Sequence, residues 1–240
     1  MSRLSSVAAL VEEIVTANRI LAQHGVLDAY GHVSVRHPEE PERFLLARSL
    51  APELVTHSDV MEFGLDGKPT GGDLRKSYLE TPIHSEIYKA RADVMAVVHS
   101  HSPSVIPFCV STVRLRPIYH MSSFLSPETS VFDIRKKFGY TDMLVRKPEH
   151  GAALAATLGK DRVALMRGHG FVTAGDSLPI AVFQAIYTAL NASLQWQAIS
   201  LGGETTYLDS DEAKLAWETN RASVSKPWEV WARNAMQGPG

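Results

Sequence analysis

The sequence holds a single cysteine, Cys109, among its 240 residues. One cysteine excludes a disulfide framework within the chain and a cysteine-rich zinc module. The sequence also has no run of ~18 apolar residues, the length that a membrane-crossing helix needs. Its first residues lack the apolar segment of a secretory signal peptide. We therefore expect a cytoplasmic protein without a membrane partner.

Neither sign of charge is in marked excess in this sequence. The 24 lysines and arginines nearly balance the 26 aspartates and glutamates, which gives a formal net charge of -2. Nucleic-acid-binding domains are usually rich in basic residues, so we expect no nucleic-acid partner. The sequence has no glycine-rich dinucleotide signature, internal repeat or linker. We therefore expect no organic cofactor, and one domain over residues 1–240 that ends in a helical tail.

The composition, with 45% hydrophobic and 21% charged residues, is typical of a globular protein. Apolar residues recur both at helical spacing and in alternation, which predicts a mixture of helices and strands. We expect helices at 5–24, 79–90, 150–158 and 178–200, and a last helix in the tail with Trp217, Trp228 and Trp231. We expect strands at 30–36, 43–47, 94–98 and 163–166, and a hairpin turn at Asp66-Gly67. These elements predict an α/β fold.

Histidine is abundant, with ten in the sequence, and three of them follow expected strands. His99 and His101 are two residues apart at the end of one strand, so their side chains point to the same side. His169 follows another strand and lies between two glycines, which allow a sharp turn. Three neutral imidazoles suit Zn²⁺, Mn²⁺, Fe²⁺ or Co²⁺. The alternative is that the pair arose by chance and that each histidine is structural or lies at the surface.

Four segments together resemble the class II aldolase/adducin family: Glu80, Thr81-Pro82-Ile83-His84, His99-Ser100-His101 and Arg167-Gly168-His169-Gly170. The resemblance runs from the first expected helix to about Gly203. It implies a central, mostly antiparallel sheet flanked by helices. It also implies that the three histidines bind a divalent metal, and that Glu80 ligates this metal when no substrate is present and acts as acid and base during the reaction. Family members are usually homotetramers with active sites at subunit interfaces.

The sequence departs from the sugar-phosphate members of this family where those enzymes hold the phosphate. Their Gly-Asn turn is replaced by Gly31-His32, and their glycine turn by Ala47-Arg48-Ser49-Leu50. Two serines before the glutamate are replaced by Tyr78-Leu79. A phosphate cup needs small residues that offer backbone N–H groups and hydroxyls. Tyr119-His120-Met121 also exchanges the aromatic residue and the histidine of the aldolase motif. Phosphate binding and aldolase protonation are therefore both in doubt.

The arginines Arg48 and Arg167 make the sequence resemble the decarboxylase branch of the family. Arginine binds planar carboxylates with two parallel hydrogen bonds. We therefore expect a divalent-metal-dependent, non-oxidative decarboxylase of a hydroxylated aromatic or heteroaromatic dicarboxylate, with Glu80 as the proton donor. The expected substrate-binding residues are Arg48, Ser49, Arg167, His32, Tyr119 and His120.

Two other functions remain open at this point. One is a metal-dependent aldolase or epimerase that acts on a non-phosphorylated hydroxy acid or sugar. The other is a non-catalytic, adducin-like module or an iron-dependent oxygenase. The three histidines and Glu80 disfavour a non-catalytic module, because a scaffold has no need of buried metal ligands. Release of CO₂ or of an aldehyde separates the decarboxylase from the aldolase.

Overall fold

The computed structural model describes residues 6–125 and 127–237. Within these residues the strands form one seven-stranded sheet in the order β3-β2-β1-β4-β7-β6-β5. The strands are β1 (His32–Arg36), β2 (Arg43–Ala47), β3 (Val60–Gly64), β4 (Ala96–Ser100), β5 (Ser130–Phe132), β6 (Val163–Met166) and β7 (Gly170–Gly175). Only β5 and β6 pair in parallel, and the other neighbouring strands are antiparallel. The predicted mostly antiparallel sheet is therefore confirmed.

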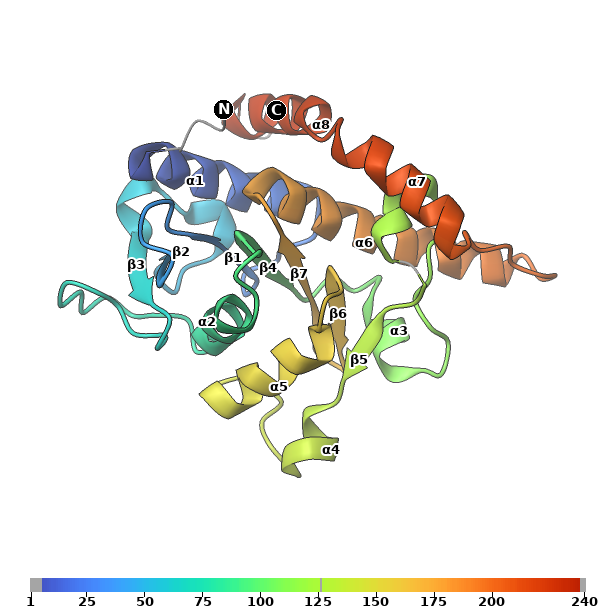
Figure 1. Ribbon diagram of the computed structural model, residues 1–240, viewed down its shortest axis with the longest axis horizontal. Coiled ribbons are helices and arrows are strands. Elements are labelled where there is room, and N and C mark those ends of the chain that lie inside the picture. The colour runs from blue at the N-terminus through green and yellow to red at the C-terminus, as the bar shows by residue number, and fades with distance from the viewer. Residues whose placement is uncertain (1–5, 126, 238–240) are drawn as a thin grey trace.

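Helices flank the sheet on both sides (Figure 1). They are α1 (Val7–Gln23), α2 (Thr81–Ala90), α3 (Ile106–Val110), α4 (Ile134–Phe138), α5 (Pro148–Leu158), α6 (Leu178–Ser200), α7 (Ser210–Arg221) and α8 (Ser225–Gln237). Short 3-10 helices cover Pro52–Leu54, His57–Asp59 and His120–Leu125. In Figure 1, α1, α6, α7 and α8 lie on one side of the sheet, and α2 and α5 lie on the other.

Alternation along the central strand β4 divides the core between these two layers. Ala96 and Val98 are buried in the cluster with α1 and α6, whereas Val97 is buried in the cluster with α2 and α5. His99 has the same parity as Val97, so its side chain lies on the α2 side of the sheet. The strand pattern therefore brings His99 toward the N-terminal end of α2.

The structure confirms most of the expected elements, and shifts in their ends bear on the site. The helix expected at 79–90 begins at Thr81, because Glu80 has the non-helical angles φ -100° and ψ 22°. The strand expected at 94–98 is β4, two residues later, because the Val94 N–H is bonded to the Arg91 carbonyl in a turn. His99 therefore lies inside the strand. The strand expected at 30–36 begins at His32, because Tyr30 N–H is bonded to the Asp28 side chain.

Two parts of the sequence prediction were wrong. The sequence predicted only a turn around His169, but β7 follows it and pairs with both β4 and β6. Glycines at both ends of β7 conceal this strand in the sequence. The tail contains two helices instead of one, since the chain turns after α7, where the Ser223 N–H is bonded to the Asn220 carbonyl. Within the described parts of the chain, no helix is both long and apolar enough to cross a bilayer.

Candidate metal centre

Four side chains converge at one end of β4. Glu80 lies directly before α2, His99 lies in β4, His101 follows that strand, and His169 lies in the turn between β6 and β7. Their potential ligand atoms all lie within 4.8 Å of one another. The structure therefore brings together four residues from three separate regions of the sequence.

The three imidazoles face one another through their Nε2 atoms. The Nε2 of His101 lies 3.0 Å from that of His99 and 3.2 Å from that of His169. The carboxylate oxygen Oε2 of Glu80 lies 3.6 Å from His99 Nε2 and 3.4 Å from His169 Nε2. This arrangement directs three nitrogens and one oxygen toward a common point.

The other ring nitrogens of two histidines are fixed by backbone carbonyls. His99 Nδ1 lies 3.1 Å from the Phe171 carbonyl oxygen, and His169 Nδ1 lies 3.0 Å from that of Met143. A carbonyl can only accept, so we assign the ring hydrogen to Nδ1 in both histidines. Each Nε2 then presents a lone pair to the common point. Metal-binding histidines are usually oriented in this way, by a hydrogen bond from the other ring nitrogen.

The backbone around His169 has an unusual conformation. Gly168 has a φ of 63°, which favours glycine, and a Cβ on Gly170 would lie 2.0 Å from the Ser100 carbonyl oxygen. Met143 has a φ of 68°, which is strained for a side chain of this kind. This conformation accompanies the hydrogen bond from His169 Nδ1 to the Met143 carbonyl. The role of Met143 has no signal in the sequence.

One carboxylate oxygen of Glu80 is held by a hydrogen bond, and the other faces the imidazoles. Its Oε1 accepts a 2.8 Å hydrogen bond from the Val145 N–H, so Oε2 is the atom that faces the imidazoles. Burial raises the pKa of Glu80, but its close contacts with His169 and His99 outweigh burial and lower the pKa overall. Glu80 is therefore an ionised carboxylate.

The donor set fits a divalent cation. Three imidazole nitrogens and one carboxylate are ligands for Zn²⁺, Mn²⁺, Fe²⁺ and Co²⁺. Burial and the neighbouring imidazoles lower the pKa of His101 to about 4, which keeps its ring neutral and able to ligate at neutral pH. Glu80, His99, His101 and His169 are therefore the residues that would hold the metal.

His32 is in ring contact with this centre and with Tyr78. Tyr78 in turn is hydrogen-bonded to the loop that contains Arg48 and Ser49. The His32 ring lies 5.0 Å from the His99 ring and 4.6 Å from the Tyr78 ring. The Tyr78 hydroxyl donates a 2.5 Å hydrogen bond to the carbonyl of Leu50, directly after Ser49. Burial raises the pKa of Tyr78 to about 12, so the phenol remains protonated.

Both predicted substrate-binding arginines are held by aspartates. Arg48 Nε donates a 2.6 Å hydrogen bond to Asp59, and Arg167 Nε lies 2.7 Å from a carboxylate oxygen of Asp133. Within the described residues neither arginine makes a hydrogen bond through its two terminal nitrogens. The aspartates therefore orient the guanidinium groups through Nε.

Tyr119 and His120 lie elsewhere in the chain. The Tyr119 ring lies 6.1 Å from the Tyr187 ring on α6, and the His120 carbonyl accepts a hydrogen bond from Asn220 on α7. In residues 6–125 and 127–237, no hydrogen bond or ring contact links this pair to the four converging residues. The structure of one chain does not bring them to the centre, and their role in substrate binding stays a prediction.

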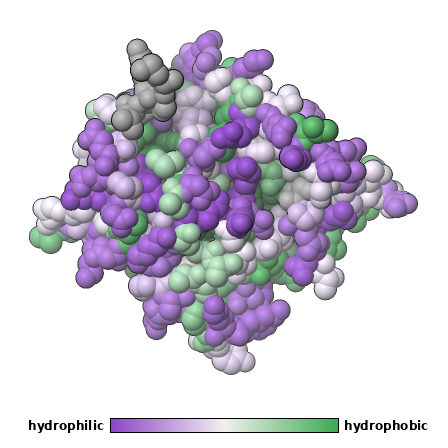
Figure 2. Space-filling model, in the orientation of Figure 1, coloured by the Kyte–Doolittle hydropathy of each residue, from purple (hydrophilic) through white to green (hydrophobic). Residues whose placement is uncertain are grey.

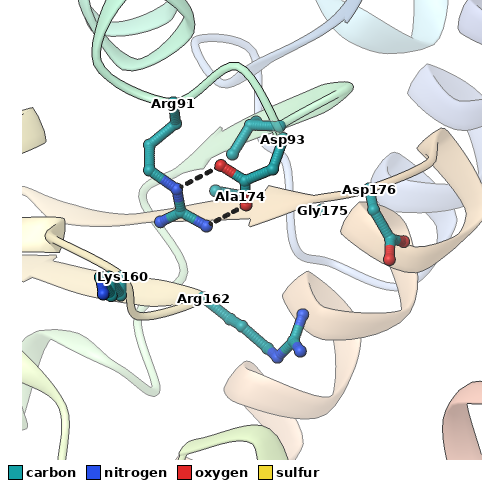
Figure 3. Close-up of a pocket in the computed structure, with 8 residues that line it drawn as sticks. Arg91, Asp93, Lys160, Arg162, Ala174, Gly175 and Asp176 are labelled. Atoms are coloured by element: carbon teal, nitrogen blue, oxygen red, sulfur yellow. Dashed lines mark hydrogen bonds and ion pairs between the residues drawn. The ribbon is translucent and has the colours of Figure 1, made fainter.

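A separate cavity of about 480 Å³ lies at the opposite end of β4 and β7 (Figure 3). The strand register sets this position, since Ala96 pairs with Gly175 at the cavity end and Ser100 pairs with Phe171 at the histidine end. Arg91 and Asp93 on the cavity wall are joined by hydrogen bonds of 2.8 and 2.7 Å. This wall carries no histidine, so the cavity is not the candidate metal centre.

The fold and site together define an α/β protein with three histidines and one carboxylate at the end of a mostly antiparallel sheet. Residues 12–196 match the family model of the class II aldolase and adducin N-terminal domain. The chain therefore belongs to the class II aldolase and adducin family. The solved structure of an aldolase II superfamily protein from Pseudomonas syringae has a TM-score of 0.80 and 25% identity, over 99% of this chain and 95% of that chain.

Two curated relatives with high similarity are decarboxylases. The decarboxylase tropJ of Talaromyces stipitatus is 36% identical over 95% of this chain and 94% of its own length. The 3,4-dihydroxyphthalate decarboxylase of Arthrobacter keyseri is 34% identical over 90% of this chain and 94% of its own length. Because these decarboxylases are similar over most of the chain, and because three histidines and Glu80 converge as potential metal ligands, the protein is a lyase.

Proposed function

We propose that the protein is a divalent-metal-dependent decarboxylase of a hydroxylated aromatic or heteroaromatic dicarboxylate. The observation that carries this proposal is the convergence of Glu80, His99, His101 and His169 in a chain whose relatives at 36% and 34% identity are decarboxylases. The relative from Arthrobacter keyseri acts on a dihydroxyphthalate by its name. We extend that substrate class, an aromatic ring with hydroxyl and carboxylate groups, to this protein.

The reaction breaks the bond between a ring carbon and the departing carboxylate carbon. The ring carbon first gains a proton; the bond to the carboxylate carbon then breaks, its electron pair moves through the ring toward an ortho oxygen, and CO₂ leaves. A divalent cation held by the four residues supplies Lewis acidity toward the oxygens of the substrate. Glu80 Oε2 takes the hydroxyl proton of the substrate and returns it to the ring carbon. A proton from water then restores the hydroxyl.

The loop before β3 supports a substrate without phosphate. The Arg48 N–H donates a 2.8 Å hydrogen bond to the Asp59 carbonyl, and the Ser49 N–H donates a 2.7 Å hydrogen bond to that of Lys76. These two backbone groups are already bonded, so they are not free for the phosphate oxygens of a sugar phosphate. The terminal nitrogens of Arg48 suit a carboxylate.

Replacement of either arginine is expected to lower the catalytic efficiency, kcat/KM. Since a hydrogen bond to a charged group contributes ~1.5–3 kcal/mol, Arg48→Ala or Arg167→Ala should lower kcat/KM by ~10–150-fold. Lysine at either position should restore little, because it lacks the planar fork. Steady-state kinetics with 3,4-dihydroxyphthalate measures this, with Arg233→Ala on the exposed side of α8 as the control. Unchanged kcat/KM in both alanine variants would remove the arginines from the substrate site.

We also propose that the chain assembles as a homotetramer, or a multiple of it, with active sites at subunit interfaces. Most of the surface seen in Figure 2 is hydrophilic. Apolar side chains are nevertheless exposed along and after α6, with Leu190 40%, Trp196 61% and Leu201 88% exposed. Contact with a second copy would cover such residues. Light scattering should give at least four times the 26.3 kDa mass of the chain. A monodisperse and active monomer is the contrary result.

A direct comparison of products tests the proposed function. The metal-loaded protein is offered hydroxyphthalates and hydroxypyridine carboxylates, and in parallel L-fuculose 1-phosphate. We expect CO₂ from an aromatic acid and no efficient cleavage of the sugar phosphate. Efficient cleavage of the sugar phosphate without CO₂ from any aromatic acid would favour an aldolase instead.

A further inference from the structure

A buried series of hydrogen bonds leads from the core to the edge of the metal centre. The Tyr88 hydroxyl lies 2.7 Å from Ser34 Oγ, and Ser34 Oγ lies 2.6 Å from His84 Nδ1. His84 Nε2 then lies 2.6 Å from His32 Nδ1. We call these four residues the Tyr88 network. All four are at most 2% exposed.

The secondary structure explains how the network is built. His32 and Ser34 are two residues apart on β1, and His84 and Tyr88 are four residues apart on α2, so each pair shares one face of its element. The two faces lie against each other across the α2 side of the sheet. His32 is also the direct cross-strand partner of His99. The network therefore ends next to a metal-binding residue.

The hydrogen bonds of the network can run in only one favourable direction. Burial raises the pKa of Tyr88, so its phenol keeps its hydrogen. Among the described residues, the Tyr88 hydroxyl is also bonded to the backbone of Val97, a contact that lowers its pKa as a donated N–H does. Ser34 Oγ is therefore the acceptor left for the Tyr88 hydrogen. A buried hydroxyl hydrogen without an acceptor is costly. Tyr88 therefore donates to Ser34, and the Ser34 hydroxyl donates to His84 Nδ1.

This direction fixes the hydrogen positions of both imidazoles. His84 is fully buried and its Nδ1 accepts from Ser34, so the one hydrogen of its neutral ring is on Nε2. Burial and His99 lower the pKa of His84 to about 3, against the opposing charge of Glu80. The Nε2–H group of His84 donates to His32 Nδ1, so the ring hydrogen of His32 must be on Nε2. In residues 6–125 and 127–237, His32 Nε2 makes no hydrogen bond. His32 thus has an N–H group without a protein partner beside the metal centre.

We propose that the Tyr88 network holds His32 in the Nε2–H form and that this N–H donates a hydrogen bond to a carboxylate oxygen of the substrate. Tyr88, Ser34 and His84 are positioning residues, and His32 is the residue that contacts the substrate. A site with a fixed donor selects a substrate atom that can only accept, as a carboxylate oxygen does. This inference rests on the proposed function for the class of substrate, but the hydrogen positions do not depend on it.

The hydrogen positions are tested by solid-state NMR of the full chain, loaded with Zn²⁺ and labelled with ¹⁵N in the histidine rings. Protonated and unprotonated ring nitrogens give well-separated signals, and the His32→Phe spectrum identifies those of His32. We expect Nε2 of His32 to be protonated and Nδ1 to be unprotonated. A hydrogen on Nδ1 of His32 overturns the proposal. The hydrogen positions are read in the unmutated protein, and the variant serves only to assign the signals.

The contact with the substrate is tested by calorimetry with phthalate, which has two carboxylates on an aromatic ring. His32→Phe removes the donor, and His84→Leu removes the group that fixes it, so both should raise the Kd for phthalate by ~10-fold or more. His84→Gln can still donate to His32 Nδ1 and should recover most of the affinity. Tyr140→Phe, at a tyrosine that is 97% exposed, is the matched control and should leave the Kd unchanged.

Three results separate the possible failures. An unchanged Kd in His32→Phe overturns the substrate contact. A wild-type protein that releases CO₂ from aromatic acids but binds phthalate no more tightly than His32→Phe overturns the inference and leaves the proposed function intact. A protein with the Nε2–H form of His32 that neither binds phthalate nor releases CO₂ overturns the proposed function and the substrate contact together.

Discussion

The double variant His99→Ala/His101→Ala is expected to lose its stoichiometric divalent metal and to release no CO₂ above background. The two side chains supply two of the four converging ligand atoms, and only Glu80 and His169 would remain. Two ligands without the geometry of a closed site hold a divalent ion weakly. The measurement is the metal content per chain after dialysis, followed by the rate of CO₂ release.

His57→Ala is the control for this double variant. The His57 side chain is 59% exposed, pairs with Glu12 and is not among the converging residues, so its loss should change neither metal content nor rate. Circular dichroism should show that the double variant is folded. If the folded double variant retains one metal ion per chain, the centre is not where the structure brings the histidines together.

Replacement of Glu80 by Gln is expected to lower kcat by ~10²-fold or more, the usual size of a lost proton-transfer group. Gln keeps the size of the side chain, and its amide oxygen can still accept from the Val145 N–H that holds Oε1 in the native protein. It cannot take a proton from the substrate and return it. The measurement is kcat for CO₂ release at saturating substrate, with metal content determined on the same sample.

Glu86→Gln provides the comparison on α2, the helix that directly follows Glu80. Glu86 pairs with Lys89 on α2 and is not among the converging residues, so its replacement should leave kcat near the native value. A Glu80→Gln variant with full metal content and near-native kcat would show that another group delivers the proton. A low kcat explained entirely by lost metal would assign Glu80 to metal binding alone.

The chemistry of the site was easier to predict from the sequence than its supporting contacts. His99 and His101 are two apart at the end of an expected strand, and His169 lies between glycines, so spacing alone directed attention to them. Glu80 has no such signal and was identified by its resemblance to a family motif. Glu80 lies just before α2, so it takes no part in the helical pattern. Its side chain is held by Val145, which is 65 residues later in the sequence.

Contacts between residues far apart in the sequence could not be predicted in this way. The Met143 carbonyl is bonded to His169, 26 residues away, through a backbone conformation that a methionine rarely adopts. Asp59 and Asp133 each hold one of the predicted substrate-binding arginines. These pairs depend on how the loops pack, and no local pattern encodes them.

The sequence carries a partial signal for the Tyr88 network. Ser34 lies within an expected strand, and His84 and Tyr88 recur four residues apart on an expected helix. Polar residues with the same period as the apolar face indicate that they are buried together. Only the tertiary structure shows that the two elements face each other, and therefore that the network ends at His32 beside His99.

The central claim is that the four converging residues hold a metal on which decarboxylation depends. The most direct measurement follows ¹³CO₂ from carboxyl-labelled 3,4-dihydroxyphthalate, first after a chelator has removed metal and then during stepwise return of Zn²⁺, Mn²⁺, Fe²⁺ or Co²⁺. We predict no release from the metal-free protein, and a rate that rises with added metal until one ion per chain is bound. Release at the full rate from the metal-free protein would contradict the account.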